Sequence, residues 1–213
     1  MKIDFYADTH EYRVDGRRVS SVTQILKQEG FIDSRWYQPS GTNRGSMVHE
    51  LTEQMDKGTL KADHLSGSEV YPYLAAWEKF KEDIGNFSFI NIEDPVATEL
   101  YAGIPDRIAV INHKNWLIDI KTGQHELWHG LQLAAYEMGI NNTFDIPIDK
   151  RRVVHLKANG KYSICDKDKR VGAYDDSIWK TMWTALLQSR VYKQQYAKIK
   201  PGDREGLWDN GKS

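Results

Sequence analysis

Cysteine is almost absent from this chain of 213 residues, in which Cys165 stands alone. One cysteine cannot form a disulfide within the chain, and its isolation suits a protein that works in a reducing cytoplasm. The same count excludes an iron–sulfur cluster held by four cysteines of one chain. We therefore expect a fold stabilised by its hydrophobic core, which a chain of this length can build without disulfides.

Long apolar runs and an excess of one charge are also lacking. No uninterrupted apolar stretch approaches the length of a membrane-spanning helix, and the first residues lack the apolar core of a signal peptide. We expect a cytoplasmic protein that makes no membrane contact. The formal net charge is −1 at pH 7, which argues against a protein that binds nucleic acid passively over a basic surface. A local basic groove is still compatible with this balance.

The composition that is present is that of an ordinary globular protein. Hydrophobic residues make up 40% of the chain and charged residues 28%, as in typical single domains. The length also fits one domain. We predict a single domain over residues 1–213, with an N-terminal hairpin and extension (1–43), a core (44–166), a closing helix (174–196) and a tail (197–213).

Hydrophobic periodicity predicts the order of helices and strands. Apolar residues three and four apart predict helices at residues 22–28, 44–57, 67–84, 127–139 and 175–196. Short β-type runs predict strands at residues 89–92, 96–101, 104–111, 116–121, 151–157 and 162–165. Looser alternation before the Asp15-Gly16 turn predicts a small N-terminal hairpin. The predicted fold class is α/β of the α+β kind, with a central mixed β-sheet flanked by helices.

Two carboxylates and one lysine carry the chemistry that this sequence suggests. Asp106 follows Pro105 on one predicted strand, and Asp119 and Lys121 lie on the next. Strand side chains alternate between faces, so Asp119 and Lys121 point the same way. A short turn between the strands brings Asp106 beside them. Surface salt bridges are the commoner fate of such residues, but this pattern is much narrower than an isolated Asp-x-Lys triplet.

Two further motifs flank this centre in a fixed order. Upstream lies Arg44-Gly45-x-x-x-His49, and downstream lies Gln132-x-x-x-Tyr136. Together the four motifs resemble the PD-(D/E)xK nuclease superfamily, and more closely a single-domain, phage-type member of its RecB-like exonuclease branch. The resemblance covers roughly residues 40–140. It implies a restriction-endonuclease-like αβββαβ core, and it suggests a protein of a bacterial host cell, encoded by a phage or mobile element.

The resemblance also implies a metal site. Phosphodiester hydrolysis needs an activated water and neutralised phosphate charge, which one or two divalent cations supply. Oxygen ligands suit Mg²⁺, and an imidazole makes the site more favourable for Mn²⁺. The implied ligands are His49, Asp106, Asp119 and the backbone carbonyl of Ile120. Glu99 is a candidate additional ligand, with an exposed strand acid as the equal alternative.

The remaining candidate residues would act on the nucleophile or on DNA. Lys121 would deprotonate or orient water if its pKa is lowered, and would otherwise act as a fixed positive charge on the phosphate. Gln132 and Tyr136 share one helix face and are candidate catalytic and DNA-binding residues. Further DNA-binding candidates are the guanidinium of Arg44 and two aromatic rings that would stack on bases, Trp36 and Tyr37.

The function that these motifs predict is metal-dependent hydrolysis of DNA. We expect a Mg²⁺- or Mn²⁺-dependent exonuclease that leaves 5′-phosphates on DNA ends or single strands, and by resemblance works 5′→3′ in recombination, replication or repair. A homo-oligomer or a recombination partner protein is compatible with this role. Two alternatives stay open. One is a non-catalytic module that binds DNA ends or a protein, and the other is a site-specific endonuclease.

Overall fold

The computed structural model describes residues 1–33, 35 and 39–198. Within them the chain forms an α+β fold with two five-stranded sheets and flanking helices. None of the helices in these ranges is long and apolar enough to cross a membrane. The predicted base-stacking residues Trp36 and Tyr37 lie outside the described residues, as does nearly all of the predicted tail.

The N-terminal sheet combines two distant parts of the chain. Its strand order is β1-β2-β3-β6-β5, with bounds Ile3–Tyr6, Glu11–Val14, Arg17–Ser21, Tyr101–Gly103 and Val96–Ala97. The predicted hairpin is present as β2 and β3, because Asp15 and Gly16 both take the left-handed backbone conformation that such a turn requires. A short 3-10 helix, η1 (Ala7–Thr9), separates β1 from β2.

Helix α1 (Val22–Gln28) begins where the sequence predicts. The Ser21 hydroxyl accepts a hydrogen bond from the Gln24 backbone N–H, and the Gln24 side chain accepts one from the Ser21 N–H. This capping box satisfies two donors that the first helical turn leaves free. The inward face of α1 carries Val22, Ile25 and Leu26, which are fully buried.

The central sheet is mixed. Its order is β10-β9-β8-β7-β4, with bounds Tyr162–Cys165, Lys150–Leu156, Lys114–Lys121, Arg107–Ile111 and Phe87–Ile92. Only β8 and β9 pair in parallel, and the crossover between them contains α4 (Trp128–Phe144). Asn112 and His113, both with positive φ, form the predicted turn between β7 and β8.

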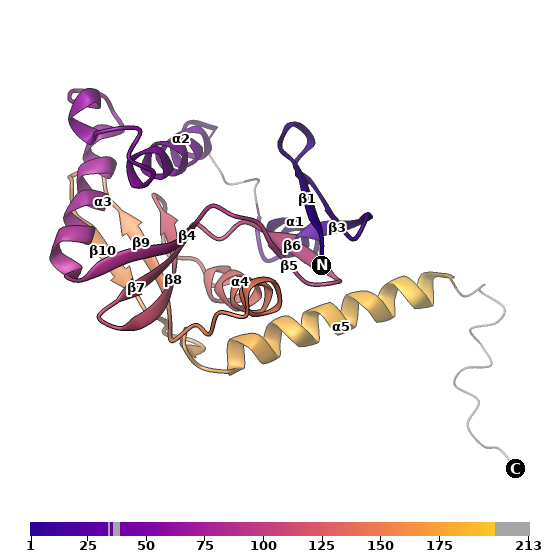
Figure 1. Cartoon of the computed structure of the whole chain (residues 1–213). Helices are drawn as coiled ribbons and strands as arrows, with labels where there is room; N and C mark the ends of the chain where they lie inside the picture. Colours follow the sequence, from indigo (N-terminus) through magenta and orange to yellow (C-terminus); the bar gives the residue numbers. More distant parts are fainter. Residues whose placement is uncertain (34, 36–38, 199–213) are drawn as a thin grey trace, which may run out of the picture.

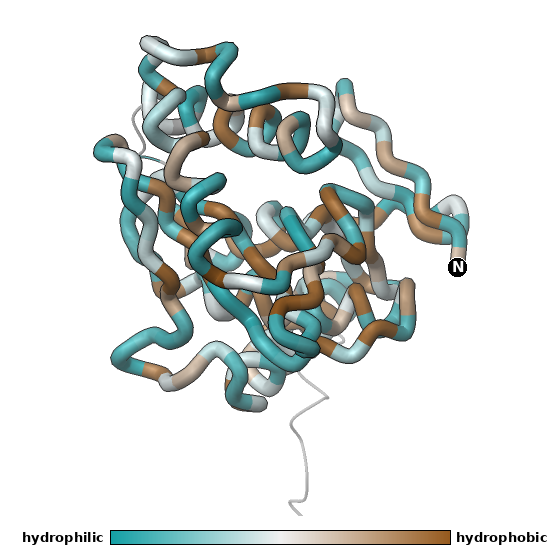
Figure 2. Tube along the Cα trace, turned by 60° about the vertical axis from the view of Figure 1, so that its left-hand side comes forward, coloured by the Kyte–Doolittle hydropathy of each residue, from teal (hydrophilic) through white to brown (hydrophobic). Residues whose placement is uncertain are grey.

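Helices cover both faces of the central sheet. One face packs against α3 (Tyr71–Ile84), with Trp77 and Phe80 against Ile118 and Ile120. The other packs against α4, with Leu131 against Leu117. Because strand residues alternate between faces, Asp119 and Lys121 share the α4 face with Leu117. Figure 2 shows hydrophobic segments through the middle of the molecule and a largely hydrophilic outer trace.

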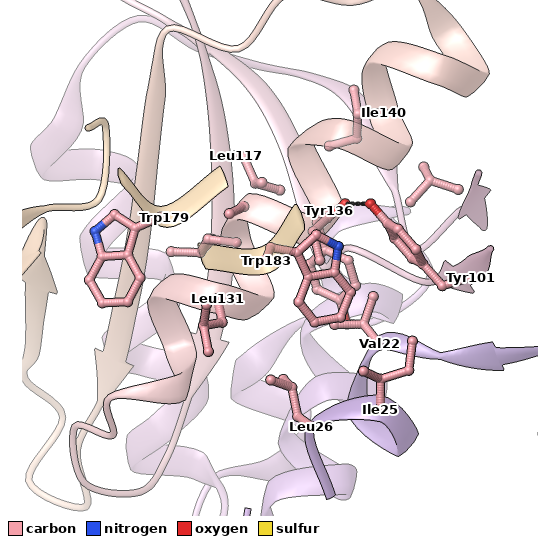
Figure 3. Close-up of a cluster of buried hydrophobic side chains, with 14 of the residues drawn as sticks. Val22, Ile25, Leu26, Tyr101, Leu117, Leu131, Tyr136, Ile140, Trp179 and Trp183 are labelled. Carbon is pink, nitrogen blue, oxygen red and sulfur yellow. Dashed lines mark hydrogen bonds between the residues drawn. The ribbon is translucent and has the colours of Figure 1, made fainter. Parts of the chain in front are cut away.

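The closing helix α5 (Ile178–Lys198) lies along the outer side of α4 (Figure 1). Figure 3 shows Trp179 and Trp183 packed in this layer with Leu131 and Tyr101, and all four side chains are buried. Gly130 on α4 permits the approach, because a Cβ there would lie 2.5 Å from the Trp179 ring. The two helices therefore extend the core beyond the sheet.

Several element bounds differ from the sequence prediction. Helix α2 runs from Pro39 to Asp56, so it begins five residues before the predicted start. Residues 67–84 hold only α3, preceded by a 3-10 helix, η3 (Ala62–Leu65). The strand predicted at 96–101 is instead β5 and β6 of the N-terminal sheet. The described ranges also contain a small hairpin, β11 (Lys167–Asp168) with β12 (Gly172–Ala173).

Candidate metal-binding and catalytic site

A cleft of about 1060 Å³ lies between the N-terminal sheet, α2 and the start of α4. It is lined by side chains from all these elements, including His10, Tyr12, Arg44, His49, Glu93, Lys121, His129, Gln132 and Tyr136. Asp106 and Asp119 are buried directly beside this lining, in contact with His49 and Lys121 respectively. The four sequence motifs therefore meet at one place.

Asp106 is held in its charged form. Its Oδ2 accepts a hydrogen bond of 2.5 Å from the Ile120 backbone N–H, and its Oδ1 lies 3.4 Å from Nδ1 of His49. Burial alone would raise the pKa of this carboxyl, but the charge and hydrogen bond of His49, with Lys121 and the Ile120 amide, lower it to about 2. Asp106 is thus a fixed negative charge at the end of the cleft.

Asp119 is less well compensated. Its Oδ2 lies 2.5 Å from Nζ of Lys121, yet neither carboxylate oxygen accepts a well-directed hydrogen bond from the described residues. Burial, with repulsion from Asp106, raises the pKa of Asp119 to about 6 despite the nearby Lys121 ammonium. A buried carboxylate with unused acceptors is what a bound cation would satisfy.

Lys121 carries a positive charge in this site. Burial acts to lower the pKa of its ammonium, but the charges of Asp119 and Asp106 outweigh burial and raise it. Of the two roles predicted for this lysine, the raised pKa favours the fixed charge over the general base. The Nζ atom also lies 5.6 Å from the centre of the Trp128 ring, which adds a cation–π contact.

Glu93 is the acidic residue that the sequence analysis missed. It follows β4 in the left-handed backbone region, and its backbone N–H donates to the Asp106 carbonyl. One ligand atom each from His49, Glu93 and Asp106 lies within 4.8 Å of the others. Burial and repulsion from Asp106 raise the pKa of Glu93 to about 8. Glu99, the candidate chosen from the sequence, is instead exposed in the bend between β5 and β6.

Helix α2 reaches this site through a buried ion network. The Asp56 carboxylate accepts hydrogen bonds from Nε of Arg107 at 2.7 Å, from Nε1 of Trp77 and from Nζ of Lys81. Arg107 is fully buried and also binds Glu93 at 2.9 Å. The network fixes the end of α2 on β7 and α3, which places His49 two turns earlier beside Asp106. Sequence reasoning found neither Asp56 nor Arg107, because single charged residues give no periodic signal.

Gln132 and Tyr136 interact with each other. The amide Nε2 of Gln132 donates to the Tyr136 hydroxyl oxygen at 3.1 Å, while the buried Oε1 of Gln132 has no partner among the described residues. Burial, reinforced by Asp119 and Asp106, raises the pKa of Tyr136 well above its usual value, so its hydroxyl is neutral. A Cβ at Gly103 would lie 2.6 Å from the Tyr136 ring, so this glycine makes room for it.

The other predicted site residues have mixed outcomes. Arg44, a predicted DNA-binding residue, lines the cleft, with its guanidinium 5.5 Å from the centre of the Tyr73 ring and its buried Nε unpaired within the described ranges. Ile120 contributes its N–H to Asp106 and its side chain to the core on the α3 face. Coordination by its carbonyl stays a prediction.

The residues present fit a hard divalent cation. Three carboxylates and one imidazole converge here, and oxygen-rich sets of this kind suit Mg²⁺ and Mn²⁺. The Asp119 oxygens accept no well-directed hydrogen bond from the described residues, and the raised pKa values of Asp119 and Glu93 indicate negative charge that Lys121 and Arg107 compensate only in part.

Comparison of the chain with models of known protein families finds no match, and comparison with curated protein sequences finds none either. A proposal for the function of this chain therefore depends on the four motifs and on the geometry of the site.

Proposed function

We propose that the chain is a Mg²⁺- or Mn²⁺-dependent deoxyribonuclease of the RecB-like branch of the PD-(D/E)xK superfamily. The observation that carries this proposal is the meeting of Asp106, Asp119 and Lys121 with His49 and Glu93 beside one cleft. The mixed central sheet with its flanking helices is compatible with the αβββαβ core that the resemblance implies, since α3, β4, β7, β8, α4 and β9 follow in this order once β5 and β6, which belong to the N-terminal sheet, are set aside.

The proposed chemistry is hydrolysis of a phosphodiester bond. A bound cation would neutralise phosphate charge and lower the pKa of a water molecule. Asp106, charged and anchored by Ile120, holds the cation side of the site, and Glu93 and His49 complete the donor set. The ammonium of Lys121 stabilises negative charge that develops on the phosphate.

The rest of the cleft would bind the DNA chain. Arg44 offers a guanidinium to the backbone phosphates, and the unpaired amide oxygen of Gln132 can accept a hydrogen bond from a base N–H. The neutral hydroxyl of Tyr136 and the ring of Trp128 line the same wall. We propose that DNA ends or single strands enter here, with 5′-phosphate products and 5′→3′ direction, in recombination, replication or repair.

The test is cleavage of end-labelled linear DNA, single- and double-stranded, with Mg²⁺, Mn²⁺ or a chelator. Wild-type protein is expected to cleave only with metal, and Asp119→Ala and Lys121→Ala to lose at least about 100-fold in rate, the effect of removing one electrostatic group from a reacting centre. Release of labelled mononucleotides from one end gives the polarity.

A matched pair of acids sharpens this test. Glu93→Gln is expected to lose cleavage, whereas Glu99→Gln, six residues away and exposed, is expected to match the wild type. Wild-type protein that binds DNA but cleaves it with neither metal would overturn the nuclease proposal in favour of a binding module. Cleavage of covalently closed circles would instead indicate an endonuclease.

A further inference from the structure

Three histidines cluster beside the cleft on the same face of the central sheet as Lys121. His125 lies in the segment between β8 and α4, His129 in the first turn of α4, and His155 on β9, paired in register with Lys121. One ring nitrogen of each lies within 4.8 Å of the other two. Their ring centres are 5.7, 5.8 and 6.3 Å apart.

Hydrogen bonds fix the tautomer of His155. Its Nδ1 lies 3.0 Å from the Gly123 carbonyl oxygen, which can only accept, so Nδ1 carries the proton. In this tautomer the neutral imidazole presents the lone pair of Nε2. The His155 side chain is more than nine-tenths buried, and its Nε2 has no hydrogen-bond partner in the part of the chain that the structure describes. A buried acceptor without a partner costs free energy unless something binds it.

The other two rings are also prepared to bind a cation. The Asp168 carboxylate contacts Nε2 of His125 at 2.9 Å and orients that ring, as carboxylates do behind metal-bound histidines. Nδ1 of His125 lies 3.2 Å from the Tyr174 hydroxyl and 3.6 Å from Sγ of Cys165, and an ion bound at Nδ1 would replace these two contacts. His129 is buried. Its Nδ1 accepts only a long bond of 3.3 Å from the Glu126 N–H. A metal ion bound to either ring nitrogen of His129 would break at most this one hydrogen bond.

We propose that His125, His129 and His155 form a second metal site, separate from the carboxylate site, that takes a Zn²⁺ ion. Three imidazoles without a carboxylate ligand are a donor set for zinc and related transition metals, not for Mg²⁺. Zinc–nitrogen bonds of about 2.0–2.1 Å would place the ring centres roughly 5 Å apart. Each imidazole ring would have to move by about 1 Å or less to reach this distance.

Such an ion would join three pieces of the candidate active site. The segment after Lys121, the first turn of α4 and the strand β9 would share one ligand set. Because Gln132 and Tyr136 follow His129 on α4, the ion would fix the end of the helix that presents them to the cleft. The site is inferred from geometry that does not depend on nuclease activity.

The test is equilibrium dialysis of the full chain, first stripped with a chelator, against Zn²⁺ in excess Mg²⁺. Wild-type protein is expected to bind one Zn²⁺ per chain at this site. His125→Asn and His155→Gln are each expected to weaken binding by at least about tenfold, since even partners behind a ligand contribute roughly 10–100-fold. His113→Asn, in the turn between β7 and β8, is the matched control.

A second pair of variants separates this site from the catalytic one. The double variant His49→Asn, Asp119→Asn is expected to keep Zn²⁺ binding while losing DNA cleavage. His125 is partly exposed, so its variant tests the site even if the buried His155 variant does not fold. Absence of Zn²⁺ binding by wild type would overturn the proposal and leave a bridging water as the partner of His155. Binding that survives His125→Asn, or that is lost only in the double variant, would overturn it as well.

Discussion

The carboxylate of Glu93 is costly for the fold while no cation is bound. Burial raises its pKa from about 4.5 to about 8, although Arg107 donates a hydrogen bond to it. A carboxyl with a raised pKa in the folded state holds its proton more tightly there than when unfolded. Its protonation therefore favours folding at low pH, and stability falls as the pH rises from about 4.5 to about 8.

Because the charged Glu93 side chain destabilises the metal-free fold, a variant without that charge is expected to gain stability and, under the proposed function, to lose cleavage. Without divalent cations, Glu93→Gln is expected to be more stable than wild type at pH 8, by on the order of 2 kcal/mol, and equal to it near pH 4. Urea unfolding at the two pH values measures the difference. If Glu93→Gln and wild type were equally stable at pH 8, the buried charge of Glu93 would not destabilise the fold as argued. Glu99→Gln serves as the control.

Glu93 is also the residue of the candidate site that could not be predicted from the sequence. Asp106, Asp119 and Lys121 were predicted because a fixed spacing and strand alternation place them together. Glu93 belongs to the site because its backbone turns at positive φ directly after β4. No period or motif in the sequence signals that turn, so Glu99, on an expected strand, was the acid that the pattern offered.

At the scale of elements, tight contacts between α4 and its neighbours depend on glycine. Gly130→Ala is expected to destabilise the protein by about 1–3 kcal/mol, because the new methyl group would overlap the buried Trp179 ring. Gly41→Ala, in α2, where a new Cβ would lie 3.9 Å from Nη2 of Arg44, the nearest non-local atom among the described residues, is expected to stabilise it by about 0.5–1 kcal/mol. Thermal unfolding distinguishes the two, and destabilisation by both would contradict this account.

The buried ion network is the second element-scale test. Asp56→Asn leaves the Arg107 guanidinium without its main charged partner in a fully buried site. We expect a loss of about 3–5 kcal/mol in stability. Lys79→Met, which removes an exposed pair with Asp83, is expected to change stability by less than about 1 kcal/mol. Denaturant unfolding measures both, and a small effect of Asp56→Asn would show that other contacts hold α2.

Helices and the central strands were predicted well, whereas only the hairpin of the N-terminal sheet was predicted. Residues 116–121 read as a strand because helices cover both faces of β8, which gives the nearly continuous apolar run Trp116-Leu117-Ile118 followed by Ile120. Residues 96–101 also look like one strand, but Thr98 to Leu100 form the turn between β5 and β6. Pairing of β6 with β3 joins residues about eighty positions apart in the chain, and local patterns carry no information about such contacts.

At the scale of the whole molecule, the two sheets differ in protection. The central strands β7, β8 and β9 are buried on both faces, whereas β1 to β3 have several exposed residues. Hydrogen exchange is therefore expected to be slower in the central sheet than in the N-terminal sheet of the free protein. If DNA fills the cleft, exchange near Ser21 and Thr23 should slow on DNA binding; unchanged exchange there would place the DNA elsewhere.

The pairing of β3 with β6 also affects when, during synthesis of the chain, the candidate site is assembled. The walls of the cleft come from residues 10–23, 41–49, 93–104 and 121–136, so a chain emerging from the ribosome lacks part of them until α4 has been made. Closing a loop of about eighty residues is entropically costly and slow compared with forming local helices. We expect the candidate site to be completed late in synthesis, so that a nascent chain would be inert toward nucleic acid nearby if the proposed function holds.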